Sequence, residues 1–407
     1  MILNGARIIS PIDNIDEVLD IKIENSVIVE IAQNIEGEGI DFSGMIISSG
    51  LVDMHCHLRE PGFEYKETIQ TGIEAALQGG FTAICPMANT NPVVDNAETL
   101  KYTTDKAKRI GFYPICAVTK WLQGQELTDF DALKHNGAIA FSDDGRPLAN
   151  LEILSKALKT GELIISHAED LELLGNPLCE SVAVAKELEV LRKIGGRLHF
   201  AHISTKKSVE LIRQAKIEGL NVTCETAPHY FSLTKEDETE DGRFKMNPPL
   251  ATQADLTAVI EGLKDGTINC IATDHAPHSL DEKTKPFVDS PFGIVGFETA
   301  LGASLKLVYD GHLTINQVIE KLSTNPSKIL GLKNQGQIKV GEVANLTIID
   351  PNIKSKVKAE EFKTKCKITP FEGMELKGRA IGVVVNGELI ENRYTPHPNP
   401  PPQGGRE

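Results

Sequence analysis

The chain has 407 residues, of which 41% are hydrophobic, a composition ordinary for a globular protein with one large core and a smaller second unit. Its 42 basic and 57 acidic residues give a formal net charge of −15, which argues against nucleic acid or an anionic membrane as a partner. A single pocket can still be basic on a protein whose net charge is negative, so a small anionic substrate stays possible. We see no signal peptide and no stretch of roughly 20 apolar residues, so we expect a cytoplasmic protein without a membrane span. Its seven cysteines form no CxxC pair and are expected to be buried and reduced.

Both ends of the chain are rich in short strand signals separated by turn residues. Apolar runs near the N-terminus cover residues 8–9, 21–23, 27–31 and 46–47, and those near the C-terminus cover 346–349 and 381–385. An Asn-Gly pair at 386–387 is a hairpin signal. We therefore predict one small β-sandwich domain built from residues 1–48 and 336–392. Residues 393–407, rich in Pro and Gly, are predicted to form a disordered or polyproline-like tail.

The middle of the chain, residues 49–335, alternates between apolar runs and amphipathic segments. Eight apolar runs begin at residues 45, 80, 111, 138, 163, 198, 222 and 268. Helix-like segments lie between them, for example at residues 66–77, 97–109, 182–194 and 206–218. Strands that are apolar throughout, each followed by a helix, indicate a parallel sheet covered on its faces, and eight such units fit a (β/α)8 TIM-type barrel. An open doubly wound sheet is the alternative, but no GxGxxG motif opens the first helix.

Nearly every apolar run of this middle region ends in a residue that can bind a metal or titrate. In a (β/α)8 barrel, the C-terminal ends of the strands form the active-site face. The residues at these ends are His55, His57, Asn89, Asp143, Asp144, His167, His202, His229 and Asp274. Such an alignment of histidines with strand ends predicts an active site.

The first of these runs ends in a His-x-His unit. Residues i and i+2 of a strand point to the same side, so His55 and His57 can reach one ion. The alternative, two unrelated strand histidines, is weakened because other His and Asp residues occupy equivalent strand ends. Asp274 would be costly to bury without a cation, and a metal supplies one. We interpret these three residues as ligands of one metal ion.

A second ion is predicted from the neighbouring strands. His167 and His202 could each be an ordinary core histidine, but as a pair beside the first group they are interpreted as its ligands. Two ions about 3.5–4 Å apart need a bridging anion. Asp143 or Asp144 can supply it, and the alternation along the strand leaves the choice open.

Imidazole and carboxylate ligands favour Zn²⁺, and two such ions would make hydroxide available from water near neutral pH. Asp274 can then carry a proton to the leaving nitrogen of an amide. Arg59 follows His57 by two residues and can hold a planar oxyanion, with Asn89 and His278 donating further hydrogen bonds. The alternative for Arg59 is an ion pair with a carboxylate at the barrel rim. We expect a small anionic amide as substrate.

Several motifs, in order along the chain, resemble those of dihydroorotases in the amidohydrolase superfamily. They are DMHCHLREPG (residues 53–62), PMANTNPVVDN (86–96), AFSDDG (140–145), SHAED (166–170), AHIST (201–205), MNPPL (246–250), IATDHAPH (271–278) and PFGIVGFE (291–298). The resemblance extends to about residue 392. One departure is Ala-Asn-Leu at 344–346, where Ala-Asp-Leu is expected, and it lies outside the site.

The resemblance implies conversion between L-dihydroorotate plus water and N-carbamoyl-L-aspartate, a step of pyrimidine biosynthesis, at a site with two Zn²⁺ ions. It implies one ion on His55, His57 and Asp274, a second on His167 and His202, and Asp144 as the bridge. Asp274 is the implied acid/base. The implied substrate contacts are His57, Arg59, Asn89, Asn247, His278, Phe292 and Gly293.

Many relatives bridge their metals with a carbamylated lysine, and Lys120 is the other bridging candidate here. Two competing functions remain. A hydantoinase or allantoinase would run the same chemistry on another ring, but hydantoins lack the carboxylate that Arg59 would hold. A non-catalytic partner of aspartate transcarbamoylase is expected to have lost metal ligands. The sequence leaves open whether the chain forms a homodimer or associates with aspartate transcarbamoylase.

Overall fold

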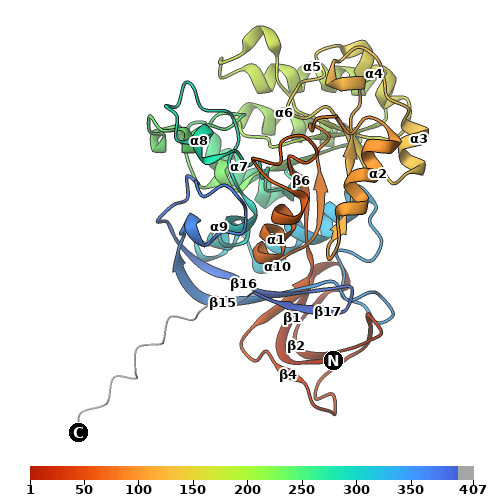
Figure 1. The fold of residues 1–407 in the computed structure, drawn as a ribbon, viewed down its shortest axis with the longest axis vertical. Helices are drawn as coiled ribbons and strands as arrows, with labels where there is room; N and C mark the ends of the chain where they lie inside the picture. Colours follow the sequence, from red (N-terminus) through yellow and green to blue (C-terminus); the bar gives the residue numbers. More distant parts are fainter. Residues whose placement is uncertain (393–407) are drawn as a thin grey trace.

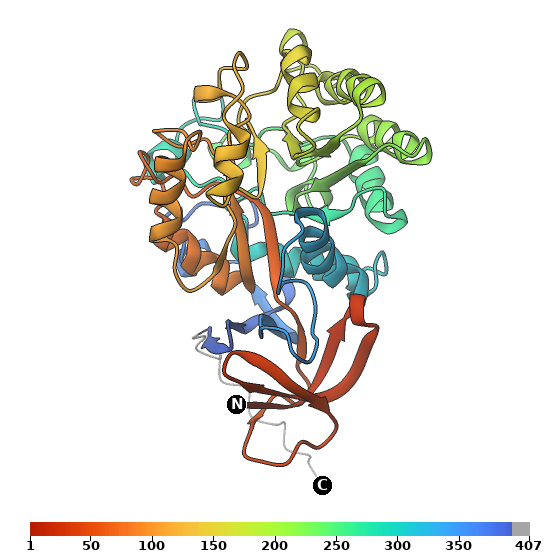
Figure 2. The same cartoon turned by 90° about the vertical axis from the view of Figure 1, so that its right-hand side faces the viewer.

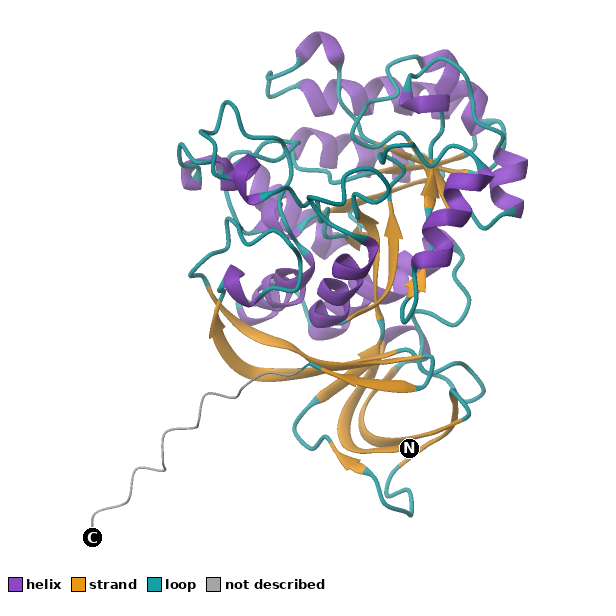
Figure 3. Ribbon diagram, in the orientation of Figure 1, coloured by secondary structure: helices purple, strands orange, loops and turns teal. Residues whose placement is uncertain are grey.

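The computed structural model describes residues 1–392, and the predicted tail with His397 lies outside them. A barrel surrounded by helices forms one part of the molecule and a curved sheet forms the other (Figure 1). Most helices lie on the barrel side, and the long strands of the curved sheet lie together at the opposite end (Figure 3).

The barrel strands are short and buried, as their apolar sequences predict. They are β6 (Leu51–Cys56), β7 (Phe81–Pro86), β8 (Gly111–Phe112), β9 (Ile115–Cys116), β10 (Ala140–Ser142), β11 (Leu163–Ser166), β12 (Arg197–Phe200), β13 (Val222–Thr226) and β14 (Cys270–Ile271). They form two parallel sheets, with strand orders β6-β7-β8 and β14-β13-β12-β11-β10-β9. Strands β8 and β9 come from the same predicted apolar run, so the eight runs account for all nine strands.

Backbone hydrogen bonds join these two sheets at both seams. Between β8 and β9, Tyr113 N donates to Ile84 O of β7, and Pro114 O accepts from Ile139 N beside β10, both at 3.0 Å. At the other seam, Cys56 of β6 forms a bridge with His275, just after β14. The strands therefore close into the predicted (β/α)8 barrel.

Helices surround the barrel (Figure 2). They are α1 (Ile69–Gly79), α2 (Ala97–Lys106), α3 (Phe130–His135), α4 (Leu151–Leu158), α5 (Cys179–Ile194), α6 (Lys206–Ile217), α7 (Gln253–Asp265), α8 (Leu280–Lys283), α9 (Phe297–Tyr309), α10 (Ile315–Ile319) and α11 (Asn325–Leu330). The side chains of Thr68, Asn96 and Thr205 accept a backbone hydrogen bond at the start of α1, α2 and α6. These caps satisfy backbone donors that the first helical turn leaves unpaired, and they determine where the helices begin.

Both ends of the chain meet in one eight-stranded sheet. Its strands are β1 (Ile2–Ser10), β2 (Ile15–Glu24), β3 (Val27–Ala32), β4 (Ile40–Asp41), β5 (Ile46–Ser49), β15 (Leu346–Lys356), β16 (Glu375–Val385) and β17 (Glu388–Glu391). The antiparallel pair β5–β15 joins the N-terminal strands to the C-terminal strands. At the far edge, Ile28 N donates to Glu342 O and Ala344 N donates to Ser26 O, so the sheet curls around its own apolar core. The domain limits at residues 48/49 and 335/336 stay a prediction.

The first apolar run of the middle region supplies two strands instead of one. It divides at Gly50, so that β5 belongs to the terminal sheet and β6 to the barrel. A Cβ atom at Gly50 would lie 2.0 Å from Thr82 Oγ1, which explains why glycine is needed at this close approach. β6 therefore leads away from the terminal sheet and carries His55 and His57 to the far side of the barrel.

Burial of the cysteines follows the sequence expectation except at Cys179, which is partly exposed. All seven cysteines lie in the described part of the chain as free thiols, and six of them are buried. Within residues 1–392, every helix is too short or too polar to cross a lipid bilayer.

Candidate metal centre

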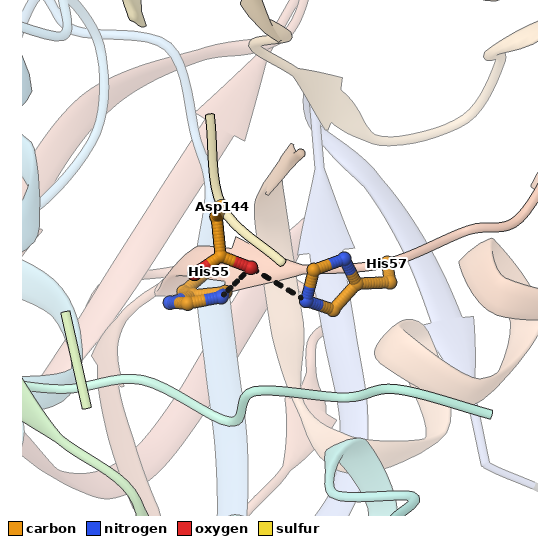
Figure 4. Close-up of side chains that lie close together, drawn as sticks. All are labelled: His55, His57 and Asp144. Carbon is orange, nitrogen blue, oxygen red and sulfur yellow. Dashed lines mark ion pairs between the residues drawn. The ribbon is translucent and has the colours of Figure 1, made fainter. Parts of the chain in front are cut away.

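His55 and His57 lie at the carboxyl end of β6 and point to the same side of the strand, as the spacing predicts (Figure 4). Their Nε2 atoms lie 3.4 Å and 3.3 Å from Asp144 Oδ2. The same two nitrogens lie 3.5 Å and 3.3 Å from Asp274 Oδ1, which follows β14. Four potential ligand atoms thus surround one point at the barrel mouth.

The other oxygen of Asp144 faces the second pair of histidines. Asp144 Oδ1 lies 3.5 Å from His167 Nδ1 and 3.3 Å from His202 Nε2. These two imidazole nitrogens lie 2.9 Å from each other. Asp144 therefore stands between the two pairs, in the position that a bridging carboxylate requires. The six residues predicted as metal ligands all meet in this cluster.

The geometry of the His55 side fits a zinc ion. Zinc holds nitrogen and oxygen ligands at about 2.0–2.2 Å in a tetrahedron, so neighbouring ligand atoms lie about 3.3–3.5 Å apart. The four distances between the histidine nitrogens and the carboxylate oxygens fall between 3.3 and 3.5 Å. His55 Nε2 is buried and has no hydrogen-bond partner among the described residues. Such an orphaned nitrogen, facing two buried carboxylates, is suited to a cation.

Hydrogen bonds at the opposite ring nitrogens orient His55 and His57. His55 Nδ1 donates to Glu225 Oε1 at 2.7 Å, and His57 Nδ1 donates to Asn89 Oδ1 at 2.8 Å. Because these acceptors hold the proton on Nδ1, the Nε2 lone pairs point into the cluster. Burial opposes ionisation of Glu225, yet its contacts with His199 and His55 lower its pKa to about 2. Glu225 therefore stays a carboxylate and keeps accepting this bond.

The contacts that support His167 are longer than those that orient His55 and His57. His167 Nε2 lies 3.4 Å from Glu169 Oε2, and the Glu169 side chain is 21% exposed. Asn247 Nδ2 donates to Glu169 Oε1 at 3.2 Å and also lies 3.2 Å from His167 Nε2. The structure thus places Asn247, a predicted substrate contact, next to the second pair of histidines.

The structure distinguishes the two neighbouring aspartates that the strand alternation left open. Asp143 turns away from the cluster, and its carboxylate accepts hydrogen bonds from the backbone and hydroxyl of Thr119. Burial raises the pKa of Asp143 to about 6 despite these bonds. Lys120, the other bridging candidate, pairs with Glu126 and is 41% exposed. Asp144 is the residue placed in the bridging position.

Three site residues adopt a backbone conformation that is rare for residues other than glycine. The φ angles are 63° at Arg59, 35° at His202 and 47° at Asp274. Backbone strain of this kind concentrates at functional sites, where the surrounding structure holds it in place. It turns the chain sharply as it leaves the strand and so aims these side chains at the barrel mouth.

The predicted substrate residues Arg59, His278, Phe292 and Gly293 lie together. Arg59 Nε donates to Pro277 O at 3.0 Å, and Arg59 Nη2 lies 3.4 Å from His278 Nε2. His278 Nε2 donates to Phe292 O at 2.7 Å. Burial lowers the pKa of Arg59 to about 10, so the guanidinium remains charged at neutral pH. At Gly293, with φ 127°, a Cβ atom would lie 2.6 Å from Ala276 O, so glycine is required beside the site.

Two buried residues near the cluster were given no role from the sequence. Glu225 lies within β13 and faces the barrel interior, where a carboxylate among apolar neighbours is the signal that identifies it. His229, which ends the seventh apolar run, packs against Tyr230 with the rings tilted and their centroids 4.1 Å apart. Burial lowers the pKa of His229 to about 4, so this imidazole is neutral.

Comparisons with known proteins agree with this site. The model of the amidohydrolase family matches residues 46–390. A protein named dihydroorotase from Geobacter metallireducens is 44% identical, with 97% of this chain and 100% of the relative covered. The dihydroorotase of Acetivibrio thermocellus is also 44% identical, with 96% and 98% covered. The L-hydantoinase of Arthrobacter aurescens has a TM-score of 0.88 at 24% identity, with 96% of this chain and 95% of that chain covered, a likeness of fold. The chain therefore belongs to the amidohydrolase family and, within it, to the dihydroorotases.

Proposed function

We propose that the chain catalyses the reversible hydrolysis of L-dihydroorotate to N-carbamoyl-L-aspartate, a step of pyrimidine biosynthesis. One observation carries the proposal: the cluster around Asp144 lies at the barrel mouth next to a partly buried, charged Arg59. The cluster is suited to opening a cyclic amide. The guanidinium is suited to the carboxylate that dihydroorotate carries.

In this proposal, two zinc ions occupy the cluster. His55, His57 and Asp274 would hold one ion, His167 and His202 the other, and Asp144 would bridge them. When bound, such a pair polarises an amide carbonyl and activates water near neutral pH. The donor set of imidazole and carboxylate supports zinc over ions that prefer all-oxygen or thiolate ligands.

Asp274 serves as the proton carrier of the reaction. Burial opposes its ionisation, but the neighbouring His55 and His57 hold the pKa of Asp274 well below its usual range. Asp274 is therefore ionised at neutral pH and begins the hydrolytic direction as a proton acceptor. It takes a proton from the attacking water and delivers it to the ring nitrogen as the amide bond breaks. In ring closure the same carboxylate moves the proton in the opposite direction.

The chain's other residues bind and orient the substrate. Arg59 donates to the substrate carboxylate, and His278 and the backbone at Phe292 and Gly293 lie beside it. A hydantoinase would leave the Arg59 charge without an anionic partner, and the hydantoinase neighbours share the fold only. A non-catalytic partner of aspartate transcarbamoylase is disfavoured because all six predicted ligands lie in the cluster.

The test is an assay of the purified chain with its zinc content. We expect turnover of L-dihydroorotate and of N-carbamoyl-L-aspartate, about two zinc ions per chain, and negligible turnover of hydantoin. Turnover of hydantoin alone would replace this proposal with a hydantoinase. A protein without zinc and without turnover, both alone and mixed with aspartate transcarbamoylase, would favour the non-catalytic role.

A further inference from the structure

His278 lies between two hydrogen-bond donors and two acceptors. On one side, its Nδ1 atom lies 3.1 Å from Lys66 Nζ and 3.6 Å from Glu282 Oε2. On the other side, its Nε2 atom lies 2.7 Å from Phe292 O and 3.4 Å from Arg59 Nη2. A neutral imidazole carries one proton, so these neighbours compete over which nitrogen holds it.

The short contacts select one tautomer. With the proton on Nε2, His278 donates to Phe292 O at 2.7 Å and its Nδ1 accepts from Lys66 at 3.1 Å. With the proton on Nδ1, the remaining partners are Glu282 at 3.6 Å and Arg59 at 3.4 Å. In that state the bare Nε2 would face a carbonyl oxygen and the Nδ1 proton would face an ammonium group. The first arrangement is therefore favoured.

His278 is also held in its neutral form. Burial, followed by the charges of Arg59 and Lys66, lowers the pKa of His278 to about 2. Protonation of both nitrogens is thus excluded at neutral pH, and the choice of tautomer alone decides what His278 presents to the site.

Lys66 and the Phe292 carbonyl together favour this tautomer, and Lys66 is the partner that a side-chain substitution can remove. The Lys66 side chain is 14% exposed, and its ammonium is anchored by Glu282 Oε1 at 3.1 Å. Without the Lys66 ammonium, Glu282 is the charged group left beside Nδ1, and it can only accept a hydrogen bond. Removing Lys66 is therefore expected to let Glu282 compete with Phe292 O for the proton, so that a larger share of His278 carries it on Nδ1.

We propose that Lys66 is a positioning residue that keeps His278 in the Nε2–H form, so that the proton that Phe292 O accepts in this structure can be shared with a substrate carboxylate bound beside Arg59. A carboxylate only accepts hydrogen bonds, so an Nε2 without its proton would repel it. This inference rests on the proposed function, because it assigns Lys66 to recognition of the anionic group of that substrate.

The direct test is nuclear magnetic resonance of the zinc-loaded protein with ¹⁵N-labelled histidine. The signals of His278 are identified by their loss in His278→Gln. We expect Nε2 to carry the proton in the wild type and in Lys66→Arg, and a clearly larger share of the Nδ1–H form in Lys66→Met. The same share of the Nε2–H form in Lys66→Met as in the wild type would overturn the inference, and this readout does not depend on turnover.

The kinetic test compares KM with kcat for L-dihydroorotate. Lys66→Met is expected to raise KM at least about ten-fold, equivalent to about 1.4 kcal/mol, with kcat changed less. Lys66→Arg, which keeps a donor, should restore most of the loss. Lys101→Met is the matched control, because Lys101 is 72% exposed on α2 and pairs with Asp105.

These outcomes separate the inference from the proposed function. If the wild type is inactive but Lys66→Met still changes the tautomer of His278, the proposed dihydroorotase function is rejected. The role of Lys66 in setting the tautomer is then retained. An active wild type with an unchanged KM in a folded Lys66→Met variant would reject the inference alone. If Lys66→Met fails to fold, Lys66→Leu supplies the comparison, since its side chain also lacks a hydrogen-bond donor.

Discussion

The two halves of the candidate metal centre share Asp144 but are supported differently. On the His55 side, Glu225 is buried and accepts at 2.7 Å, and the second histidine of the pair is held by Asn89 at 2.8 Å. On the His167 side, the supporting Glu169 is partly exposed and lies 3.4 Å away. The first half is therefore supported by short hydrogen bonds, and the second half by a longer contact with a partly exposed carboxylate.

The distances between potential ligand atoms also differ between the His55 side and the His167 side. The nitrogen–oxygen distances on the His55 side already match those around a tetrahedral ion. The two nitrogens of His167 and His202 lie 2.9 Å apart, closer than the roughly 3.3 Å that such an ion needs. We infer that the first half is preorganised and that the second must spread its imidazoles to accept an ion. The His167 side should therefore bind zinc more weakly.

The largest effect is expected from replacing Asp274, the proposed acid/base on the His55 side. Asp274→Asn should lower kcat by at least about 10²–10⁴-fold, the usual range for a lost proton carrier. The fold and the ion on the His167 side should persist, because Asp274 contacts the other half. Turnover and zinc content of the same preparation check this. Wild-type kcat in the variant would remove Asp274 from the mechanism.

The next largest effect concerns Glu225 and Glu169, the carboxylates that contact a histidine on each side of the cluster. Glu225→Gln should weaken zinc binding about 10–100-fold, because a neutral amide holds the proton of His55 less firmly. Glu169→Gln, the matched variant on the other half, should change zinc affinity by less than Glu225→Gln does. Zinc affinity is measured by competition with a coloured chelator. Equal losses in the two variants would contradict the difference between the halves.

A smaller effect is expected at Arg59, the proposed contact of the substrate carboxylate next to the His55 side. Arg59→Ala should raise KM for dihydroorotate at least about ten-fold, the scale of one lost hydrogen bond to a charged group. Both zinc ions should remain bound, since Arg59 contacts backbone and His278 and is no ligand. An unchanged KM would show that the carboxylate is held elsewhere.

The smallest effect is a difference in chelator sensitivity within the wild-type protein. Stepwise treatment with a chelator should remove the ion on the His167 side first, leaving a species with one zinc per chain. Zinc content is followed by atomic absorption against chelator concentration. A single step that removes both ions together would mean that the two halves bind with similar affinity.

Local patterns identified most of the fold and the ligand set. Apolar runs reveal strands because a barrel strand is buried on both faces, and His55 and His57 show themselves as a pair because the side-chain period of a strand is two. The same periodicity cannot show that the run beginning at residue 45 divides at Gly50. That division depends on the contact of Gly50 with Thr82, which is distant in sequence.

The sequence by itself determined the alternation of strands and helices, the terminal sheet, and the family to which the motifs point. Strand alternation left Asp143 and Asp144 equivalent and the family resemblance implied Asp144; the tertiary structure places Asp144 in the cluster while Asp143 accepts from Thr119. It also decided that Glu225 braces His55 and that Lys66 reaches His278, 212 positions away along the chain. The reason is physical: hydrophobic periodicity reports burial over a few neighbouring residues. A hydrogen bond between distant side chains depends on how the barrel closes.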